Sequence, residues 1–213
     1  MSLTVEQKVN RRMLGSKLGL SEASYLSQIG WFESAESSTP TDAHGHPIPW
    51  FTYPAIHFLK ERILKDELHV FEFGSGNSTL WWMNIAASVH SVEHEEEWFE
   101  RIRAQISQKV TYEHVLLEYD GRYCRAIADK QMAFDVVVVD GRDRVNCIKH
   151  SIPALTDRGV LILDNADRDS YRPGFDLLTQ EGYSNLTFTG MGPVNLAAWS
   201  TTIFYRSGNC LGI

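Results

Sequence analysis

The sequence predicts an α/β domain built on a doubly wound, mostly parallel sheet of seven strands. Two apolar runs, 134–140 and 159–164, do not alternate polar with apolar residues, which is typical of strands covered on both faces. Segments of helical length, with apolar residues at three- and four-residue spacing, separate the strand candidates after residue 66. This alternation of strand and helix indicates parallel strands joined by right-handed crossovers.

Seven segments have the composition of strands, because Val, Ile, Leu, Phe and other strand-forming residues dominate them. They are 69–73, 88–93, 110–118, 134–140, 159–164, 183–189 and 199–206. The last two are joined by a stretch rich in Gly and Pro, so we expect them to form an antiparallel hairpin that closes the sheet. Helices are expected at 78–87, 95–108, 121–130, 143–155 and 175–182.

Residues 1–66 have a different pattern. A helix-like segment, 21–37, is followed by a polar, turn-forming stretch, 38–49, and by an amphipathic segment, 50–66. We therefore expect a helical N-terminal cover over residues 1–66 and a core domain over 67–213. The apolar stretch 47–54 within the cover is expected to act as a lid over a ligand.

Composition narrows the class of protein. The chain has 213 residues, 43% of them hydrophobic, which is enough for one large core. Its three cysteines form no Cys-x-x-Cys pair, so we expect a reducing, cytoplasmic environment. No stretch approaches the length of a membrane span, and the formal charge of −7 without a Lys/Arg cluster argues against a nucleic-acid surface. The oligomeric state stays open.

The segment 70–82 carries the most informative motif. Its apolar run contains Glu72 and ends in Gly74-Ser75-Gly76, after which a helix is expected to begin. Glycines at such a strand-to-helix turn let the backbone approach a ligand, and Asn77 or Ser78 can cap the helix. A nicotinamide dinucleotide motif would need a third glycine where Thr79 stands, which disfavours that class of oxidoreductase.

These residues resemble the first motif of class I S-adenosylmethionine (SAM)-dependent methyltransferases, in which an acidic residue precedes x-Gly-x-Gly. A second signature of that family, an acidic residue that ends the second strand, is matched by Glu93, seventeen positions beyond Gly76. The resemblance covers about residues 50–205 and is strongest to a branch of bacterial methyltransferase-like proteins of uncharacterised activity. It implies a Rossmann-like methyltransferase fold, SAM as the cofactor and a small-molecule acceptor.

The resemblance also implies roles for particular residues. Glu93 would accept hydrogen bonds from the ribose hydroxyls, and Glu72 would face the amino-acid moiety of SAM. His94, Asp120 and Gly121 would border the adenine. The expected cofactor contacts are Trp50, Tyr53, Glu72, Gly74, Ser75, Gly76, Asn77, Ser78, Glu93, His94, Asp120, Gly121 and Asp140.

Asp140, Asp164 and Asn165 end two neighbouring strands and should converge at one edge of the sheet. Oxygen-rich sites of this kind suit Mg²⁺ or Ca²⁺, and the spacing is similar to that of catechol and caffeoyl-CoA O-methyltransferases. Those enzymes have a lysine where this chain has Asp143. We favour the alternative that the three residues line an acceptor pocket without a metal, with Asp140 as the candidate catalytic residue.

Methyl transfer needs alignment and, for some acceptors, removal of a proton, but no covalent enzyme intermediate. The expected function is therefore SAM-dependent methylation of a small molecule. A non-catalytic SAM-binding or scaffold protein with the same fold remains the alternative.

Overall fold

The computed structural model describes residues 4–63 and 67–213. Within these residues the strands form one seven-stranded sheet in the order β3-β2-β1-β4-β5-β7-β6. The strands are β1 (His69–Phe73), β2 (Ser88–Glu93), β3 (Val110–His114), β4 (Phe134–Val139), β5 (Leu155–Leu163), β6 (Ser184–Gly190) and β7 (Trp199–Tyr205). Strands β1 to β5 pair in parallel, whereas β7 is antiparallel to both β5 and β6, which confirms the predicted fold class.

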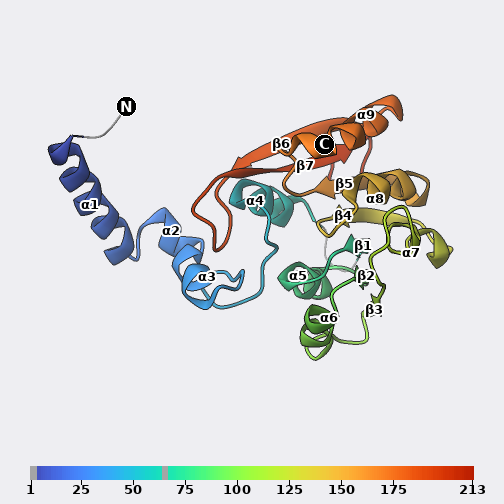
Figure 1. Ribbon diagram of the computed structural model, residues 1–213, viewed down its shortest axis with the longest axis horizontal. Helices are drawn as coiled ribbons and strands as arrows, with labels where there is room; N and C mark the ends of the chain where they lie inside the picture. Colours follow the sequence, from blue (N-terminus) through green and yellow to red (C-terminus); the bar gives the residue numbers. More distant parts are fainter. Residues whose placement is uncertain (1–3, 64–66) are drawn as a thin grey trace.

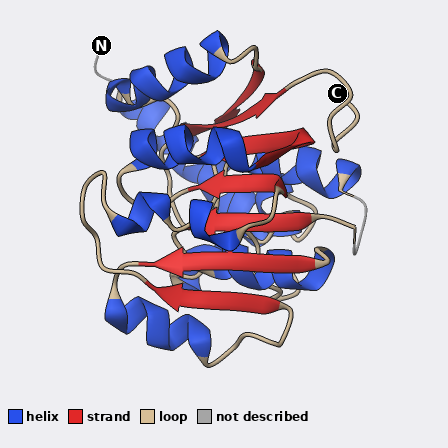
Figure 2. Ribbon diagram, turned by 90° about the vertical axis from the view of Figure 1, so that its right-hand side faces the viewer, coloured by secondary structure: helices blue, strands red, loops and turns tan. Residues whose placement is uncertain are grey.

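Helices cover both faces of the sheet (Figure 2). The helices of the described residues are α1 (Val5–Leu20), α2 (Tyr25–Gln28), α3 (Trp31–Ser37), α4 (Tyr53–Arg62), α5 (Asn77–Ile85), α6 (Glu96–Arg103), α7 (Arg122–Arg125), α8 (Arg144–Ser151) and α9 (Arg172–Gln180), with short 3₁₀ turns at Ala128–Lys130, Ile152–Ala154 and Asp169–Tyr171. No helix among the described residues combines the length and the apolar character that a bilayer crossing requires.

The sheet divides the core into two clusters because successive side chains of a strand point to opposite faces. Val70 of β1 packs in the cluster that contains Leu59 of α4 and Trp82 of α5. Its neighbour Phe71 packs in the other cluster, with Ile148 of α8. Both faces of the central strands are therefore buried, which explains their unbroken apolar runs.

Several elements differ from the sequence prediction, among them the helix expected at 95–108, which ends at Arg103. The strand expected at 110–118 ends at His114. Within the described residues it pairs with β2 alone, and β2 ends at Glu93. The last hydrogen bond between the two segments runs from the Val115 N–H to the Glu93 carbonyl. Strand β5 begins at Leu155, earlier than expected, and a register shift against β4 accommodates the extra residues. The helix expected at 121–130 is broken into α7 and a 3₁₀ turn.

The N-terminal part has two distinct environments. Helix α1 points away from the body of the protein (Figure 1), and its side chains Val9, Met13 and Leu14 are exposed. Helix α4, in contrast, buries Ile56 and Leu59 in the core. The domain boundary expected at residues 66/67 falls beside 64–66, which lie outside the described residues.

Candidate functional site

A pocket of about 450 Å³ lies at the carboxyl ends of β1, β2, β4 and β5. The order of these strands places it where the chain reverses its winding direction, at the usual ligand position of a doubly wound sheet. Several residues singled out from the sequence line it. They are Trp50, Gly74, Ser75, Glu93, His94, Asp140, Asp164 and Asn165.

Two loops meet closely at the pocket. Gly74 has a φ of +87°, a conformation that side chains disfavour, and a Cβ there would lie 2.7 Å from Gly141 Cα. A Cβ on Gly141 would lie 2.0 Å from the Tyr123 hydroxyl oxygen. The backbone of both loops can therefore line the pocket only because neither position carries a side chain.

Glu72 lies beneath the first loop, fully buried, rather than in the pocket itself. Its Oε2 accepts hydrogen bonds from Thr79 Oγ1 and, at 3.1 Å, from Ser91 Oγ. Thr79 also accepts the Gly76 N–H at 3.1 Å, so the residue that replaces the third glycine connects Glu72 to the loop. Burial raises the pKa of Glu72 to about 7.

The Glu93 carboxylate organises the opposite wall of the pocket. Oε2 accepts the Ser75 N–H at 2.9 Å and the Ser75 hydroxyl at 3.1 Å, while Oε1 accepts the backbone N–H groups of His94 at 2.7 Å and Glu95 at 3.0 Å. His94 Nδ1 lies 2.8 Å from Oε1, although its direction does not suit a hydrogen bond. Since a carboxylate has about four acceptor positions, a new ligand must replace one of these donors.

Ser75 is the donor that can be replaced most easily. Its hydroxyl also lies 2.5 Å from the Tyr112 hydroxyl, so it keeps a partner if it leaves Glu93. The Trp98 indole N–H donates to the Ser75 carbonyl at 2.6 Å and fixes the backbone of the same residue. This wall therefore has a rigid backbone and an exchangeable hydroxyl contact.

Asp140 and Asp164 face a guanidinium rather than an open cation site. Arg144, which is buried, donates to Asp140 Oδ1 at 2.9 Å and to the backbone carbonyls of Asp140 and Asp164. Asp164 Oδ1 accepts hydrogen bonds from Trp199 Nε1 at 3.0 Å and Thr201 Oγ1 at 2.6 Å. A positive charge thus pairs with one carboxylate of the site that the sequence analysis considered, but did not favour, for Mg²⁺ or Ca²⁺, and a guanidinium bound to Asp140 does not suit a divalent cation there.

Burial sets the protonation of these carboxyl groups. It raises the pKa of Asp164 to about 8, with a further rise from the charge of Asp140. Burial also raises the pKa of Asp140, and Arg144 opposes that rise. Burial therefore favours the protonated form of both groups, whereas the Arg144 guanidinium favours the carboxylate form of Asp140.

The remaining expected contacts lie elsewhere. Tyr53 is buried in the core around α4, and Asn77 donates to the carbonyl of Pro40 in the cover. A Cβ on Gly76 would lie 3.6 Å from the Trp98 ring, and Ser78 is buried in α5. Asp120 and Gly121 directly precede α7. They lie several residues after the end of β3 at His114, so they do not stand at the end of a strand.

Asp143, at the position of the expected lysine, is directed away from the pocket. Its Oδ2 accepts the Asp120 N–H at 2.8 Å, and its Oδ1 accepts the Asn146 amide at 2.8 Å. It therefore ties the loop before α7 to the start of α8.

The cover is attached to the C-terminal hairpin beside the pocket. The Thr52 N–H donates to Thr201 Oγ1 at 3.0 Å, and the Tyr53 N–H donates to the Met191 carbonyl at 2.8 Å. These bonds hold Trp50 against the pocket. Its Nε1 atom is buried and finds no hydrogen-bond partner within the described part of the chain.

Several solved structures have a similar architecture. A candidate O-methyltransferase from Klebsiella pneumoniae aligns with a TM-score of 0.57 at 14% identity, over 93% of this chain and 96% of that one. A candidate caffeoyl-CoA O-methyltransferase from Staphylococcus aureus aligns with a TM-score of 0.55 at 12% identity, over 93% and 100%. The chain has the class I methyltransferase fold.

A third structure with this methyltransferase fold contains a ligand. It is a candidate methyltransferase from Streptococcus mutans in complex with SAH, with a TM-score of 0.53 at 14% identity, over 70% of this chain and 94% of that one. No family model and no curated protein sequence matches the chain.

The pocket of this methyltransferase fold also contains residues that the sequence prediction missed. Arg142, Arg144, Arg168, Asn195 and Trp199 line it together with the expected residues. Arg144 follows Asp140 by four positions, a spacing that places two side chains on one face only within a helix. Because Asp140 precedes the helix, the spacing alone did not reveal the contact.

Proposed function

We propose that the protein is a SAM-dependent methyltransferase that acts on a small-molecule acceptor. The observation that carries this proposal is the position of the Glu93 carboxylate. It ends β2 on the rim of a pocket that the backbone of Gly74 and Gly141 also lines. A carboxylate at this strand end, next to closely packed glycine loops, suits a ribose with two hydroxyl donors.

The side chains of Glu93, Ser75 and Trp50 would adapt the pocket to the cofactor. Glu93 would accept a ribose hydroxyl in place of the Ser75 hydroxyl, which would keep its contact with Tyr112. The free Trp50 N–H would donate to a ligand oxygen. When bound, SAM supplies a methyl group on a positively charged sulfur.

Asp140 is the candidate base for the acceptor. It lines the pocket and retains 23% exposure of its side chain, so an acceptor proton can reach it. Arg144 holds the carboxylate in place, and the raised pKa of Asp140 makes it a better proton acceptor than an ordinary aspartate. Alignment by the pocket walls accounts for the remainder of the catalysis.

Two exposed arginines of the pocket favour an acidic acceptor, although carboxyl groups also line it. Arg142 and Arg168 both line it and are exposed, and neither forms an ion pair with a described residue within 4 Å. The Arg168 guanidinium donates to the Tyr171 hydroxyl at 3.3 Å. A guanidinium without a close ion pair can bind a carboxylate or phosphate group. We therefore propose that the acceptor carries such a group.

The Asp140–Arg144 ion pair also supports the second candidate, a SAM-binding protein that transfers no methyl group. The ion pair stabilises the carboxylate form and so offsets part of the rise in the pKa of Asp140 that burial causes. The two functions share cofactor binding and differ only in turnover.

We also propose that the protein acts in the cytoplasm. Cys124, Cys147 and Cys210 are buried free thiols, as is usual in a reducing compartment.

The proposed function is tested in two steps. Calorimetry with SAM and SAH should show binding to the wild type and a ten- to a hundred-fold weaker affinity for Glu93→Ala, about 1.5–3 kcal/mol for lost charged hydrogen bonds. Glu100→Ala, an exposed change on α6, is the matched control. Absence of SAM binding to the wild type would reject the proposal.

The second step incubates the protein with SAM and a panel of small carboxylic acids and phosphate esters. Formation of SAH together with a methylated acceptor supports the enzyme. SAM binding without turnover on the acids, on neutral acceptors or on amines supports the non-catalytic candidate.

A further inference from the structure

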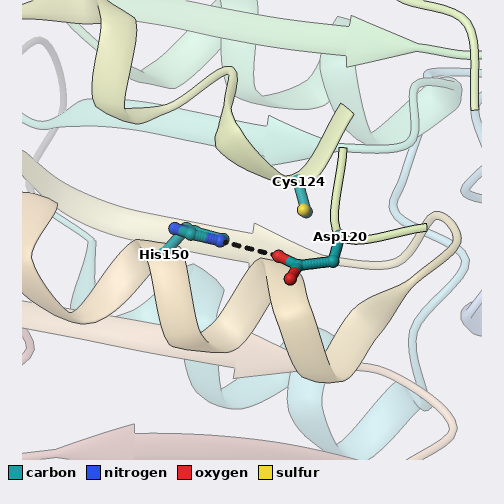
Figure 3. A group of neighbouring side chains, drawn as sticks. All are labelled: Asp120, Cys124 and His150. Carbon is teal, nitrogen blue, oxygen red and sulfur yellow. Dashed lines mark hydrogen bonds and ion pairs between the residues drawn. The ribbon is translucent and has the colours of Figure 1, made fainter. Parts of the chain in front are cut away.

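Three potential metal ligands meet outside the pocket. Asp120 precedes α7, Cys124 lies within α7, and His150 lies near the end of α8 (Figure 3). One ligand atom from each, an oxygen, a sulfur and a nitrogen, lies within 4.8 Å of the other two. Two segments of the chain that are far apart in sequence thus bring together the residue types that bind zinc in proteins.

The spacing of these atoms suits a shared metal ion. His150 Nε2 lies 3.4 Å from Asp120 Oδ1, which is long for a hydrogen bond between a ring nitrogen and a carboxylate. In a tetrahedral zinc site with bonds of about 2.0–2.1 Å, nitrogen and oxygen ligands lie about 3.3 Å apart. Small side-chain movements would therefore bring both atoms, and Cys124 Sγ, to one ion.

The cluster has a closed side and an open side. Cys124 is fully buried, and its thiol donates to the Gly121 carbonyl at 3.3 Å. Asp120 is half exposed, with 49% of its side chain accessible, whereas His150 is 19% exposed. An ion can enter from the side of Asp120, and water from the same side can complete the coordination.

The local charge would assist a cation. The Asp143 carboxylate accepts the Asp120 N–H, and burial followed by the charge of Asp143 raises the pKa of the Cys124 thiol. The competing cation is Arg125, which lies 2.9 Å from Asp120 Oδ1, but its side chain is 51% exposed. An exposed ion pair of this kind adds little stability, so Arg125 can swing into solvent when a metal binds.

We propose that Asp120, Cys124 and His150 bind one Zn²⁺ ion, with a water molecule as the fourth ligand. Binding releases the thiol proton of Cys124 to solvent and leaves a thiolate on the metal. A thiolate and an imidazole select Zn²⁺ over Mg²⁺ and Ca²⁺, which prefer oxygen ligands. The ion would join α7 to α8, and so stabilise the loop from Asp140 to Asp143 that borders the pocket.

The test uses the full chain after removal of metals with a chelator. Calorimetry with ZnCl₂ should show one ion bound per chain, and Cys124→Ser or His150→Asn should weaken the affinity by about 100-fold or more, since each loses one of three protein ligands. The control variants are Cys210→Ser and His44→Asn, which change a thiol and an imidazole outside the cluster.

Cobalt gives a second measurement that does not depend on stability. Co²⁺ bound to the wild type and to Cys210→Ser should show the absorbance of a cobalt–thiolate bond, and Cys124→Ser should lack it. Zn²⁺ binding that is absent, or that is unchanged by both Cys124→Ser and His150→Asn, would overturn the proposal. Neither outcome depends on methyl transfer.

Discussion

Arg144 Nη2 lies 2.9 Å from Asp140 Oδ1, and the same guanidinium also donates to the backbone carbonyl of Asp164. One buried side chain thus joins the carboxyl ends of β4 and β5. It neutralises the acidic group at the place where the sequence suggested a metal ion.

Arg144→Ala should lower the free energy of unfolding by about 3–5 kcal/mol, because it leaves the Asp140 carboxylate and three backbone carbonyls without their buried partner. Urea denaturation measures the change. Arg103→Ala, which removes an exposed partner of Glu100, should cost less than about 1 kcal/mol. Equal effects of the two variants would contradict the structural role of Arg144.

Stability should fall as the pH rises from about 5 to about 8. The pKa of Glu72 is raised from 4.5 to about 7 and that of Asp164 from 3.8 to about 8, both mainly by burial. The folded state therefore holds these protons more tightly than the unfolded state, and their stabilising effect, about 1.4 kcal/mol per unit of pKa, is lost as each group ionises.

Glu72→Gln and Asp164→Asn should each flatten this dependence in urea denaturation across the pH range. Asparagine keeps an oxygen for Trp199 and Thr201, so Asp164→Asn preserves the hydrogen bonds. Glu100→Gln, on the surface, should leave the slope unchanged. A wild-type stability that rises through this range would show that other groups dominate.

Trp50→Phe should weaken SAM binding by about five- to ten-fold, in line with one hydrogen bond of about 1 kcal/mol. The change removes the free Nε1 donor and keeps an aromatic ring. Trp82→Phe also removes a buried, unpartnered indole N–H, but from the core, and should alter stability rather than affinity. The same affinity for wild type and Trp50→Phe would exclude the proposed contact.

Arg142→Ala and Arg168→Ala should reduce kcat/KM for acidic acceptors by about ten-fold or more each, the value of one charged hydrogen bond. Neutral acceptors should be affected little, and SAM affinity should be retained. Arg103→Ala again serves as the control. An equal loss of kcat/KM for acidic and neutral acceptors would indicate that the arginines shape the pocket and do not recognise the charge of the acceptor.

The sequence predicted the sheet well because buried parallel strands leave unbroken apolar runs. The same rule located Gly74, Glu93, Asp140 and Asp164, since each directly follows or ends a strand. It was less informative for Asp120, because β3 stops at His114 and the chain then follows an irregular path. Tyr53 begins a helix, and only tertiary packing decided that its ring enters the core.

Gly74 and Gly141 touch across two strands, so neither position can change without the other loop moving. Over evolutionary time the two sites should therefore vary together. A homologue that has replaced either glycine will have rearranged the loop after β4. Glycine at both positions is thus a simple marker for selecting, from sequence alone, those distant homologues that keep the same pocket shape.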